Sequence, residues 1–328
     1  MSGQRLQGRK AAVTGAGGFI GNAICRRLAV EGAEALGLDV NPETADRVRA
    51  SGAEFVEADV ADREGLAAAL HGADLVVHTA AQVREWGSMD DFIRVNVAGT
   101  AHLLDACAQA GADRVVHISS VVVYGYESPS DQDESAARRT YGNPYIDTKS
   151  ASDRLACRRG SVVIRPGDVY GPGSVPWTLR PLEMARAGQL AVPGRGDGLM
   201  LPLYIDDLAD AVVLALADGQ AGEAYTVWDD RARVTFEDHF NHLARLAGGR
   251  EARRMPRPVL ELAGMAMEGW AKLRGAPPAF SAGAVTFIDR RAAVSAAKAR
   301  DQLGWAPAVT YEEGMRRTEE WLRAEHLI

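Results

Sequence analysis

The chain has 328 residues, 47% apolar and 25% charged, a composition that excludes a disordered chain and predicts about two domains at roughly 150 residues each. The 37 basic and 44 acidic residues give a net charge of −7, which argues against nucleic acid as a partner, because basic residues neutralise its phosphates. Cys25, Cys107 and Cys157 have neither disulfide-framework nor metal-site spacing. We therefore expect a reducing, cytoplasmic location and no metal site.

No segment has the length and apolar character of a membrane span. The nearest candidate, residues 259–273, is interrupted by Glu261, Glu268 and Lys272 and predicts an amphipathic helix. Packing against the protein is the commoner role for such a helix, and attachment to a membrane surface is the rarer one.

Short apolar runs alternate with helical patterns over the first half of the chain. The runs are rich in Val and Ile and do not alternate with polar residues, as is typical of strands buried on both faces. Strand and helix in alternation predict a parallel sheet with helices on both faces. The predicted strands are 11–14, 35–39, 55–59, 74–80, 114–119 and 162–165, and the predicted helices include 22–30, 62–70 and 92–110.

Glycine and proline become frequent between residues 172 and 198, which marks a change of organisation. Beyond that stretch, residues 203–205 and 225–228 are predicted strands, 206–217 is a predicted helix, and the chain from 235 onward is mostly helical. We expect a cofactor domain over residues 1–172 and a smaller, mostly helical substrate domain over 173–328. Residues 203–228 are expected to return to the first domain.

A glycine-rich segment, Thr14 to Gly21, directly follows the first predicted strand. Its G-x-x-G-x-x-G spacing between a strand and a helix is typical of dinucleotide binding. Gly15 permits the tight turn, Gly18 lets the backbone approach a pyrophosphate, and Gly21 lets the helix pack on the strand. The phosphates would meet free N–H groups at the positive end of the helix dipole.

Asp39 ends the second predicted strand, close to the position, about 20 residues past the glycines, of the acidic residue that binds the adenosine ribose. A carboxylate there repels a 2′-phosphate, and no Arg follows it in Val40-Asn41-Pro42. The sequence therefore predicts NAD rather than NADP.

Ser120, Tyr145 and Lys149 form a candidate catalytic set. Ser120 follows the fifth strand at the carboxyl edge of the sheet, and Tyr145 and Lys149 share one helix face after the helix-starting pair Asn143-Pro144. A free phenol, with a pKa near 10, is a poor base at neutral pH. An ammonium and a positive nicotinamide nearby would lower its pKa. We assign Tyr145 as general acid/base, Lys149 as the group that lowers its pKa, and Ser120 as the residue that orients the substrate oxygen, with hydride passing to or from the cofactor.

With these residues, the chain resembles the extended short-chain dehydrogenase/reductase family, also called the NAD-dependent epimerase/dehydratase family, over nearly its whole length. The resemblance implies a doubly wound Rossmann sheet, adenine contacts from Asp59 and Val60, and a supporting role for Asn96 behind Tyr145. For Asp59 and Asn96, a cap or a buried polar residue is the simpler alternative. The implied cofactor-binding residues are Gly15, Gly18, Phe19, Ile20, Gly21, Asp39, Asp59, Val60, Ala80, Ala81, Gln82, Asn96, Tyr145, Lys149 and Pro166.

Two departures from this family bear on the substrate. Sugar-nucleotide dehydratases and decarboxylases usually carry an acidic residue after the catalytic Ser or Thr, where this chain has valines 121–123. They also tend to carry an Arg that holds a diphosphate, whereas residues 199–203 here are apolar. Residues 84–87 resemble the 3-beta-hydroxysteroid dehydrogenase and dihydroflavonol reductase side of the family. The predicted substrate-binding residues are Trp86, Val121, Val122, Asp168, Val169, Trp177 and Leu201, although the apolar ones could equally be core residues.

We therefore expect an NAD-dependent oxidoreductase that interconverts a secondary alcohol and a ketone on a fairly apolar small molecule, steroid-like or similar. A sugar-nucleotide 4-epimerase that retains NAD needs the same three residues and is the alternative. A non-catalytic NAD-sensing module ranks last, because such proteins often lose the Tyr or the Lys. The resemblance also implies a homodimer that pairs through the helices near 92–110 and 144–159.

Overall fold

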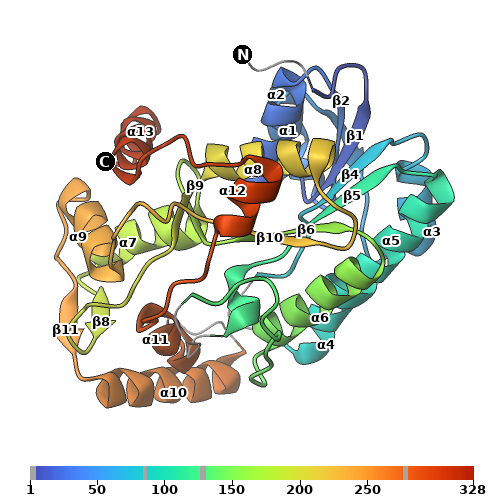
Figure 1. Cartoon of the computed structure of the whole chain (residues 1–328). Coiled ribbons are helices and arrows are strands. Elements are labelled where there is room, and N and C mark those ends of the chain that lie inside the picture. The colour runs from blue at the N-terminus through green and yellow to red at the C-terminus, as the bar shows by residue number, and fades with distance from the viewer. Residues whose placement is uncertain (1–4, 84–86, 126–130, 276–279) are drawn as a thin grey trace.

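A seven-stranded parallel sheet forms the centre of the molecule (Figure 1), in the order β10-β6-β5-β4-β1-β2-β3. The computed structural model describes residues 5–83, 87–125, 131–275 and 280–328. The strands of this sheet are β1 (Lys10–Thr14), β2 (Glu34–Asp39), β3 (Glu54–Glu57), β4 (Leu75–His78), β5 (Arg114–Ile118), β6 (Val162–Pro166) and β10 (Ala224–Val227). The doubly wound parallel sheet predicted from the sequence is confirmed.

Two small sheets and a set of helices complete the described chain. The small sheets pair β7 (Asp168–Tyr170) with β9 (Pro202–Tyr204) and β8 (Ala191–Pro193) with β11 (Arg253–Met255). The α-helices are α1 (Phe19–Val30), α2 (Ala45–Ala50), α3 (Arg63–Ala69), α4 (Met89–Phe92), α5 (Gly99–Ala110), α6 (Pro144–Arg158), α7 (Arg180–Arg186), α8 (Ile205–Asp218), α9 (Phe236–Leu246), α10 (Arg257–Arg274), α11 (Ala282–Ile288), α12 (Ala297–Leu303) and α13 (Tyr311–Ala324). Short 3-10 or π-helical turns are η1 (Pro42–Thr44), η2 (Ile93–Ala98), η3 (Val121–Tyr124) and η4 (Val175–Leu179).

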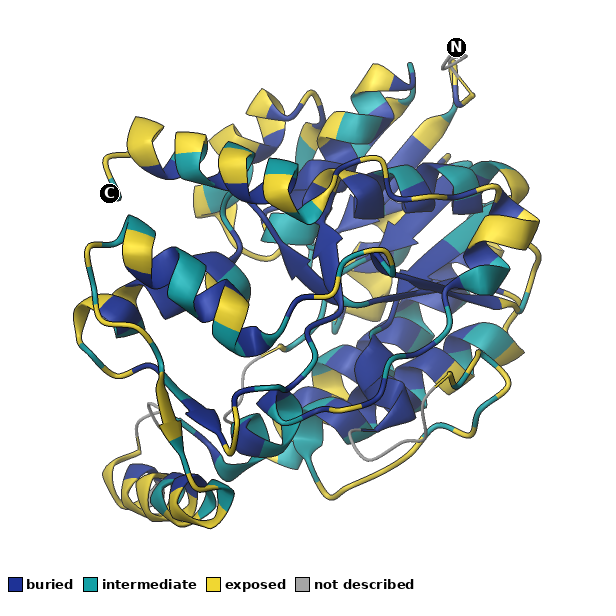
Figure 2. Ribbon diagram, turned by 60° about the vertical axis from the view of Figure 1, so that its left-hand side comes forward, coloured by how far each residue is buried: buried dark blue, intermediate teal, exposed yellow. Residues whose placement is uncertain are grey.

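Helices cover both faces of the main sheet because its strands are apolar on both sides. In β1, Ala11 and Val13 pack into one core with α1 and α8, while Ala12 packs into a second core with α3 and α5. Figure 2 shows the strands as the most buried layer. This burial on both faces is the reason for the continuous Val- and Ile-rich runs in the sequence.

The strand order reverses between β1 and β4. In open α/β sheets, ligands bind in the crevice outside the carboxyl ends of the strands at such a reversal. Here the glycine-rich loop follows β1, and residues 79–82 follow β4. The topology therefore places both segments at the edge where the sequence predicts the cofactor.

The single helix predicted over residues 92–110 is wrong in one respect. The segment consists of α4, a π-helical turn η2 and α5. At Gly99, where η2 meets α5, a Cβ atom would lie 2.8 Å from Cγ2 of Val60, so the absence of a side chain allows this close approach. A π-turn adds a residue to the helical repeat, which the 3.6-residue periodicity used in the prediction does not represent.

The second half of the chain contributes both to the main sheet and to a separate lobe. The strand β10 pairs with β6 at one end of the sheet, and α8 packs against α1. The lobe contains α7, α9, α10 and α11 together with the β8–β11 pair (Figure 1). Within the described ranges, none of the helices has the length and apolar character needed to cross a membrane.

Candidate active site

The glycine-rich loop is shaped by close contacts that exclude side chains. Gly15 has a φ of +70°, and a Cβ there would lie 2.9 Å from the backbone N of Ala80. A Cβ on Gly21 would lie 2.2 Å from the carbonyl oxygen of Gly15. Both positions therefore require glycine, Gly15 for the turn against the β4 loop and Gly21 for packing of α1.

The first turn of α1 suits an anionic group. Gly18 is its N-cap, and in the described chain no side chain caps this turn. The helix begins at Phe19 and Ile20, whose backbone N–H groups lie among the first four of a helix that lack intrahelical partners. These groups and the helix dipole fit the pyrophosphate of a dinucleotide.

Asp39 holds the glycine-rich loop in place. One carboxylate oxygen accepts a hydrogen bond from Gly17 N at 2.8 Å, and the other accepts from Asn41 N at 3.0 Å. Arg47 on α2 donates to the carbonyl oxygen of Gly17. The sequence prediction did not include Arg47, because it lies on a separate helix rather than directly after Asp39. The carboxylate is thus oriented beside the loop, where a ribose contact is predicted.

Asp59 and Val60 follow β3 on the same side of the fold. Asp59 accepts a hydrogen bond from Ala61 N at 2.9 Å and lies 3.6 Å from Nη1 of Arg94. Val60 is buried against Gly99. The local capping role of Asp59 is present, and its contact with adenine stays a prediction.

A buried hydrogen-bonded chain connects β1, β4 and η2. His78 Nδ1 lies 2.8 Å from Oγ1 of Thr14, and its Nε2 lies 3.0 Å from Oγ1 of Thr100. Since Thr100 donates its hydroxyl hydrogen to the carbonyl oxygen of Asn96, it must accept from His78 Nε2–H. This assigns His78 as the neutral Nε2–H tautomer, in agreement with burial and the nearby Lys149 charge, which lower its pKa to about 3.

Asn96 joins the predicted cofactor loop to the helix of Tyr145. Its side chain accepts from Gln82 N at 2.7 Å, donates to Gln82 O at 3.1 Å, and donates to Oγ1 of Thr148 at 3.0 Å. Thr148 precedes Lys149 on α6. The supporting role expected for Asn96 therefore has a physical basis, since one amide fixes both the loop that contains Ala80 and Ala81 and the helix α6.

The structure brings Ser120, Tyr145 and Asp168 together. Asn143 starts α6 by accepting hydrogen bonds from Tyr145 N and Ile146 N at 3.0 and 3.2 Å. Burial raises the pKa of Tyr145, a hydrogen bond with the Ser120 side chain opposes this, and the negative charge of Asp168 adds to it. The phenol therefore keeps its proton more firmly than a free tyrosine.

Lys149, one helical turn after Tyr145 on α6, directs its ammonium at the sheet. Nζ donates to the carbonyl oxygen of Ile118 at 2.9 Å. Burial lowers the pKa of Lys149 to about 8, although the nearby Asp153 favours its charged form. Among the protein groups around the phenol, burial and Asp168 raise the pKa of Tyr145 and outweigh the hydrogen bond with Ser120. The lowering of this pKa by Lys149 and the nicotinamide together stays a prediction.

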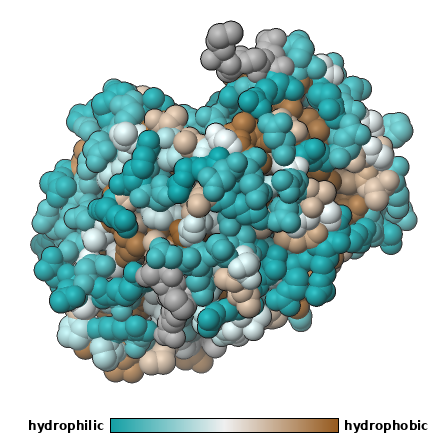
Figure 3. Space-filling model, in the orientation of Figure 1, coloured by the Kyte–Doolittle hydropathy of each residue, from teal (hydrophilic) through white to brown (hydrophobic). Residues whose placement is uncertain are grey.

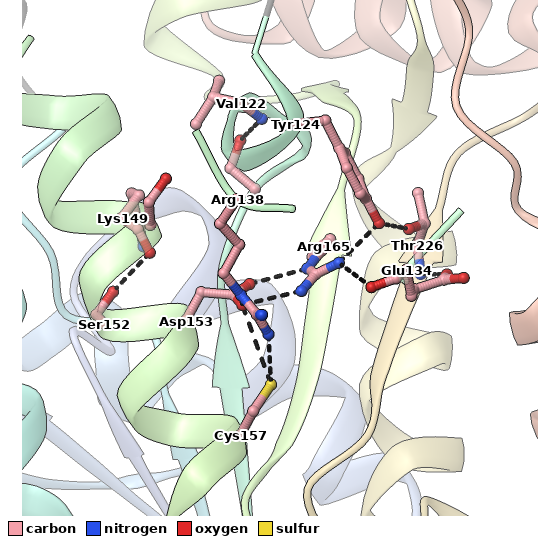
Figure 4. Close-up of polar contacts among 12 residues, drawn as sticks. Val122, Tyr124, Glu134, Arg138, Lys149, Ser152, Asp153, Cys157, Arg165 and Thr226 are labelled. Carbon is pink, nitrogen blue, oxygen red and sulfur yellow. Dashed lines mark hydrogen bonds and ion pairs between the residues drawn. The ribbon is translucent and has the colours of Figure 1, made fainter. Parts of the chain in front are cut away.

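Asp153, Arg165 and Arg138 form a buried charge cluster beyond Lys149 (Figure 4). Asp153 accepts from Arg165 Nε and Nη2 at 2.9 and 3.0 Å and from Nε of Arg138. Although burial would raise the pKa of Asp153, both arginines lower it to about 2. The ion pair fixes α6 to β6. The sequence interpretation missed this cluster, although Tyr145, Lys149 and Asp153 recur every four residues on one helix.

A second buried ion pair lies beside Tyr145. Asp168, which follows Pro166 and Gly167, accepts from Leu201 N at 2.8 Å and from Nη2 of Arg290. Arg290 also donates to the carbonyl oxygen of Leu199 at 3.2 Å. Both side chains are almost fully buried. Arg290 was not predicted, and no local pattern marks it.

An aromatic group surrounds Arg290. The guanidinium carbon lies 4.9 Å from the ring centre of Phe287 and 5.6 Å from that of Phe236. Trp177 stacks on Phe287 with ring centres 5.5 Å apart. Trp177, one of the predicted substrate-binding residues, is half-buried in this aromatic group and reaches Arg290 through Phe287.

Several predicted pocket residues are core residues in this structure. Val121 and Leu201 pack in one apolar cluster with Trp228, and Leu201 is fully buried. Val122 and Val169 are also buried. Their role as core, which the sequence left open, is what the structure shows. Trp86 lies outside the described residues.

Residues 11–228 match the family model of the NAD dependent epimerase/dehydratase family. The chain belongs to this family. It is therefore an enzyme, and the sequence predictions of this family and of NAD as cofactor are confirmed.

Relatives within this family have different activities. The 2-alkyl-3-oxoalkanoate reductase of Stenotrophomonas maltophilia (strain K279a) is 30% identical, over 94% of this chain and 98% of its own. The dTDP-glucose 4,6-dehydratase of Neisseria meningitidis serogroup B is 30% identical, over 95% of this chain and 93% of its own. The crystal structure of DesIV, a dTDP-glucose 4,6-dehydratase from Streptomyces venezuelae with NAD and TYD bound, has 25% identity and a TM-score of 0.77 over 97% of this chain and 98% of its own.

Proposed function

We propose that the protein is an NAD-dependent oxidoreductase that interconverts a secondary alcohol and a ketone on a fairly apolar substrate. The observation that carries this proposal is the grouping of Tyr145 with Ser120, one helical turn from Lys149, beside a buried ion pair and an aromatic cluster. The bound nicotinamide supplies or accepts the hydride. The protein groups handle the substrate oxygen and its proton.

The raised pKa of Tyr145 favours a role as general acid. A phenol that keeps its proton at neutral pH can donate it to a ketone oxygen, while the Ser120 hydroxyl orients that oxygen by a hydrogen bond. The Ser120 hydroxyl donates a hydrogen bond to the resulting phenolate and so stabilises it, and we assign Lys149 and the nicotinamide charge as the groups that lower its pKa further. Because the pKa of Lys149 is lowered to about 8, its ammonium can exchange a proton near neutral pH. We therefore propose that Tyr145 acts as the general acid when a ketone is reduced and as the general base in the reverse oxidation.

The ion pair of Asp168 and Arg290 supports a substrate that has no diphosphate near Arg290. Arg290 is already neutralised by Asp168 and enclosed by Phe236 and Phe287, so a phosphate would have to displace a buried carboxylate. The name of the reductase relative describes a 3-oxo acid with an alkyl branch. A ketone attached to an apolar group agrees with both observations. The apolar group could be steroid-like or an alkyl chain, and these are the two substrate classes to compare.

A sugar-nucleotide 4-epimerase is the second candidate. It is supported by the 30% identity to a dTDP-glucose 4,6-dehydratase, a sugar-nucleotide enzyme of the same family. It is opposed by valines 121–123, which fill the stretch after Ser120, and by the neutralised Arg290. The same Ser, Tyr and Lys serve both reactions.

A substrate panel separates the two candidates. NADH absorbance is followed with branched 3-oxo acids, steroid ketones and aromatic ketones, and UDP- and dTDP-hexoses are analysed for conversion by mass spectrometry and NMR. We expect NADH consumption with at least one ketone class and unchanged sugar nucleotides. Conversion of a sugar nucleotide, with no ketone turned over, contradicts the proposal.

We also propose the wider organisation that follows from the family resemblance. Residues 1–172 form the cofactor domain and 173–328 the substrate domain, with residues 203–228 returning to the first. Two copies pair through α5 and α6, and the protein works in the cytoplasm. Light scattering at micromolar concentration tests the pairing, since a monomer would refute it.

A further inference from the structure

The backbone carbonyl of Trp177 lacks the donor that a regular helix would give it. Trp177 lies in the π-turn η4, directly before α7. In a continuous α-helix the carbonyl oxygen of residue 177 accepts from the N–H of residue 181, but Pro181 has no N–H. A carbonyl group that is removed from water needs another partner. The sequence therefore leaves an acceptor open at a residue that is predicted to bind the substrate.

His239 supplies the missing donor. It lies on α9, is fully buried, and places its Nε2 at 2.6 Å from the carbonyl oxygen of Trp177. Because a carbonyl oxygen can only accept, the hydrogen must be on Nε2. Nδ1 lies 2.9 Å from the hydroxyl oxygen of Tyr311, the first residue of α13, and in the neutral ring it accepts from that hydroxyl. One imidazole thus joins the backbone of Trp177 to α9 and to the start of α13.

The position of Trp177 determines the arrangement of the aromatic group around Arg290. The indole is half-buried, stacks on Phe287 with 22° between the ring planes, and lies 5.4 Å from the ring centre of Phe236. The two phenylalanines flank the guanidinium of Arg290, which pairs with Asp168. On the face seen in Figure 3, apolar surface gathers between α7 and α11, next to the elements that carry these rings.

We propose that His239 is a positioning residue, which fixes Trp177 and thereby selects ketones by the size of their apolar group. The selection of ketones rests on the proposed function, whereas the hold on Trp177 rests on the hydrogen bond alone. Without the Nε2 donor, the carbonyl of Trp177 has an unsatisfied acceptor, and a shift of η4 relieves this cost. The indole then loses its fixed place. Large apolar groups should bind less well, whereas small ketones and NADH should bind as before.

Two amide substitutions separate the roles of the two ring nitrogens. The side-chain nitrogen of glutamine reaches about as far as Nε2, so His239→Gln keeps a donor for Trp177. The shorter asparagine side chain ends near the position of Nδ1, so His239→Asn keeps a partner for Tyr311 and loses the donor to Trp177. Tyr311→Phe is the matched control, because it removes the other hydrogen bond of the same ring and leaves Nε2–H in place.

Steady-state kinetics with ketones of increasing apolar size give the first measurement. His239→Asn should raise KM for the largest accepted ketone by about fivefold or more, the usual effect of one lost hydrogen bond. The KM of the smallest ketone, kcat and NADH binding should change little. His239→Gln and Tyr311→Phe should keep the ratio of the two KM values within about twofold of that of the unchanged protein.

A purely structural role for His239 predicts a different pattern. His239→Asn and Tyr311→Phe would then both lower the urea midpoint, and KM would move equally for all ketones or equally in both variants. Either result would overturn the proposal. Circular dichroism and NADH binding establish that each variant is folded. If His239→Asn does not fold, His239→Gln still decides, because a changed KM ratio in that variant would also overturn the proposal and an unchanged ratio would support it.

Fluorine NMR of the full chain labelled with fluorotryptophan gives a measurement that needs no turnover. Trp177→Phe assigns the resonance among the six tryptophans. We expect this resonance to shift or broaden in His239→Asn and to keep its position in His239→Gln. If the unchanged protein turned over no ketone, the proposed function would fail, and the resonance alone would test the hold on Trp177. A resonance that His239→Asn leaves unmoved would overturn the proposal.

Discussion

Asp168 and Arg290 depend on each other because both are buried beside Tyr145. Burial raises the pKa of Asp168, and the charge of Arg290 opposes this. Replacement Asp168→Asn leaves the guanidinium without its carboxylate, and an uncompensated buried charge costs about 3–5 kcal/mol. We expect a lower midpoint of urea unfolding. We also expect 3-oxo acids to gain at least about tenfold in kcat/KM relative to neutral ketones, because Arg290 becomes available to a carboxylate.

The double replacement Asp168→Asn with Arg290→Gln is the control. It removes both charges, so the specificity should return toward neutral ketones and part of the lost stability should be recovered. An unchanged ratio of kcat/KM in Asp168→Asn would show that this pair does not select the substrate.

Single residues were predictable from the sequence where one element carries the pattern. Tyr145 and Lys149 are four residues apart on α6, and Asp39 ends a strand at a known distance from the glycines. Arg290 is 122 residues from Asp168, so only the folded chain brings them together. The burial that raises the pKa of Tyr145 is likewise a tertiary property.

The helix α6 is held in position by the ion pair between Asp153 and Arg165. Replacement Asp153→Asn leaves Arg165 and Arg138 near each other without their carboxylate, and breaking such a buried pair costs about 3–5 kcal/mol. We expect a clear fall in the urea midpoint and a reduced kcat, because the same helix positions Tyr145 and Lys149. The control is Asp105→Asn, which removes a carboxylate from a more exposed ion pair with Arg159 and should leave the midpoint nearly unchanged. If both substitutions lowered the urea midpoint equally, the Asp153–Arg165 ion pair would not be what holds α6 in position.

At the level of elements, the strands of the main sheet were predicted within a few residues because apolar runs buried on both faces are easily recognised. The π-turn η2 was not predicted, because the apolar pattern of an ordinary helix does not reveal one added residue in a turn. Leu201 was predicted to bind the substrate, whereas it is fully buried in an apolar cluster with residues of η3. Composition alone does not distinguish a pocket wall from a core.

Three buried histidines make the whole molecule sensitive to acid. Burial lowers the pKa of His78 to about 3 and of His239 to about 4, and it holds the pKa of His117 well below its ordinary value. The unfolded chain takes up these protons below about pH 6.5, whereas the folded protein does not. Stability is therefore fully present above that pH and falls as the pH is lowered, by about 1.4 kcal/mol per pH unit for each histidine.

Replacement His117→Leu tests this linkage. Neither ring nitrogen of His117 has a hydrogen-bond partner among the described residues, so an apolar side chain should cost little at pH 7. Urea unfolding between pH 7 and pH 5 should show a shallower loss of stability in the variant, by about one proton's contribution. A slope identical to that of the unchanged protein would contradict the assignment of His117 as neutral and buried.

The architecture of the first half of the chain was predictable because its strands and helices alternate in a regular order. The arrangement of the second half was less predictable. There, short strands such as β8 pair with distant segments such as β11, and the lobe closes through contacts between residues far apart in sequence. The direction in which α10 faces also depends on tertiary packing, since its amphipathic pattern is the same whichever side is buried.

The most direct test of the central claim compares hydride transfer in the unchanged protein and in Tyr145→Phe. NADH consumption is measured with the best ketone of the panel, and NADH binding is measured by fluorescence. We predict that the variant binds NADH as before and loses turnover by about 10²-fold to 10⁴-fold, the usual contribution of a general acid. A variant that retains turnover would contradict the account of Tyr145 as the proton donor.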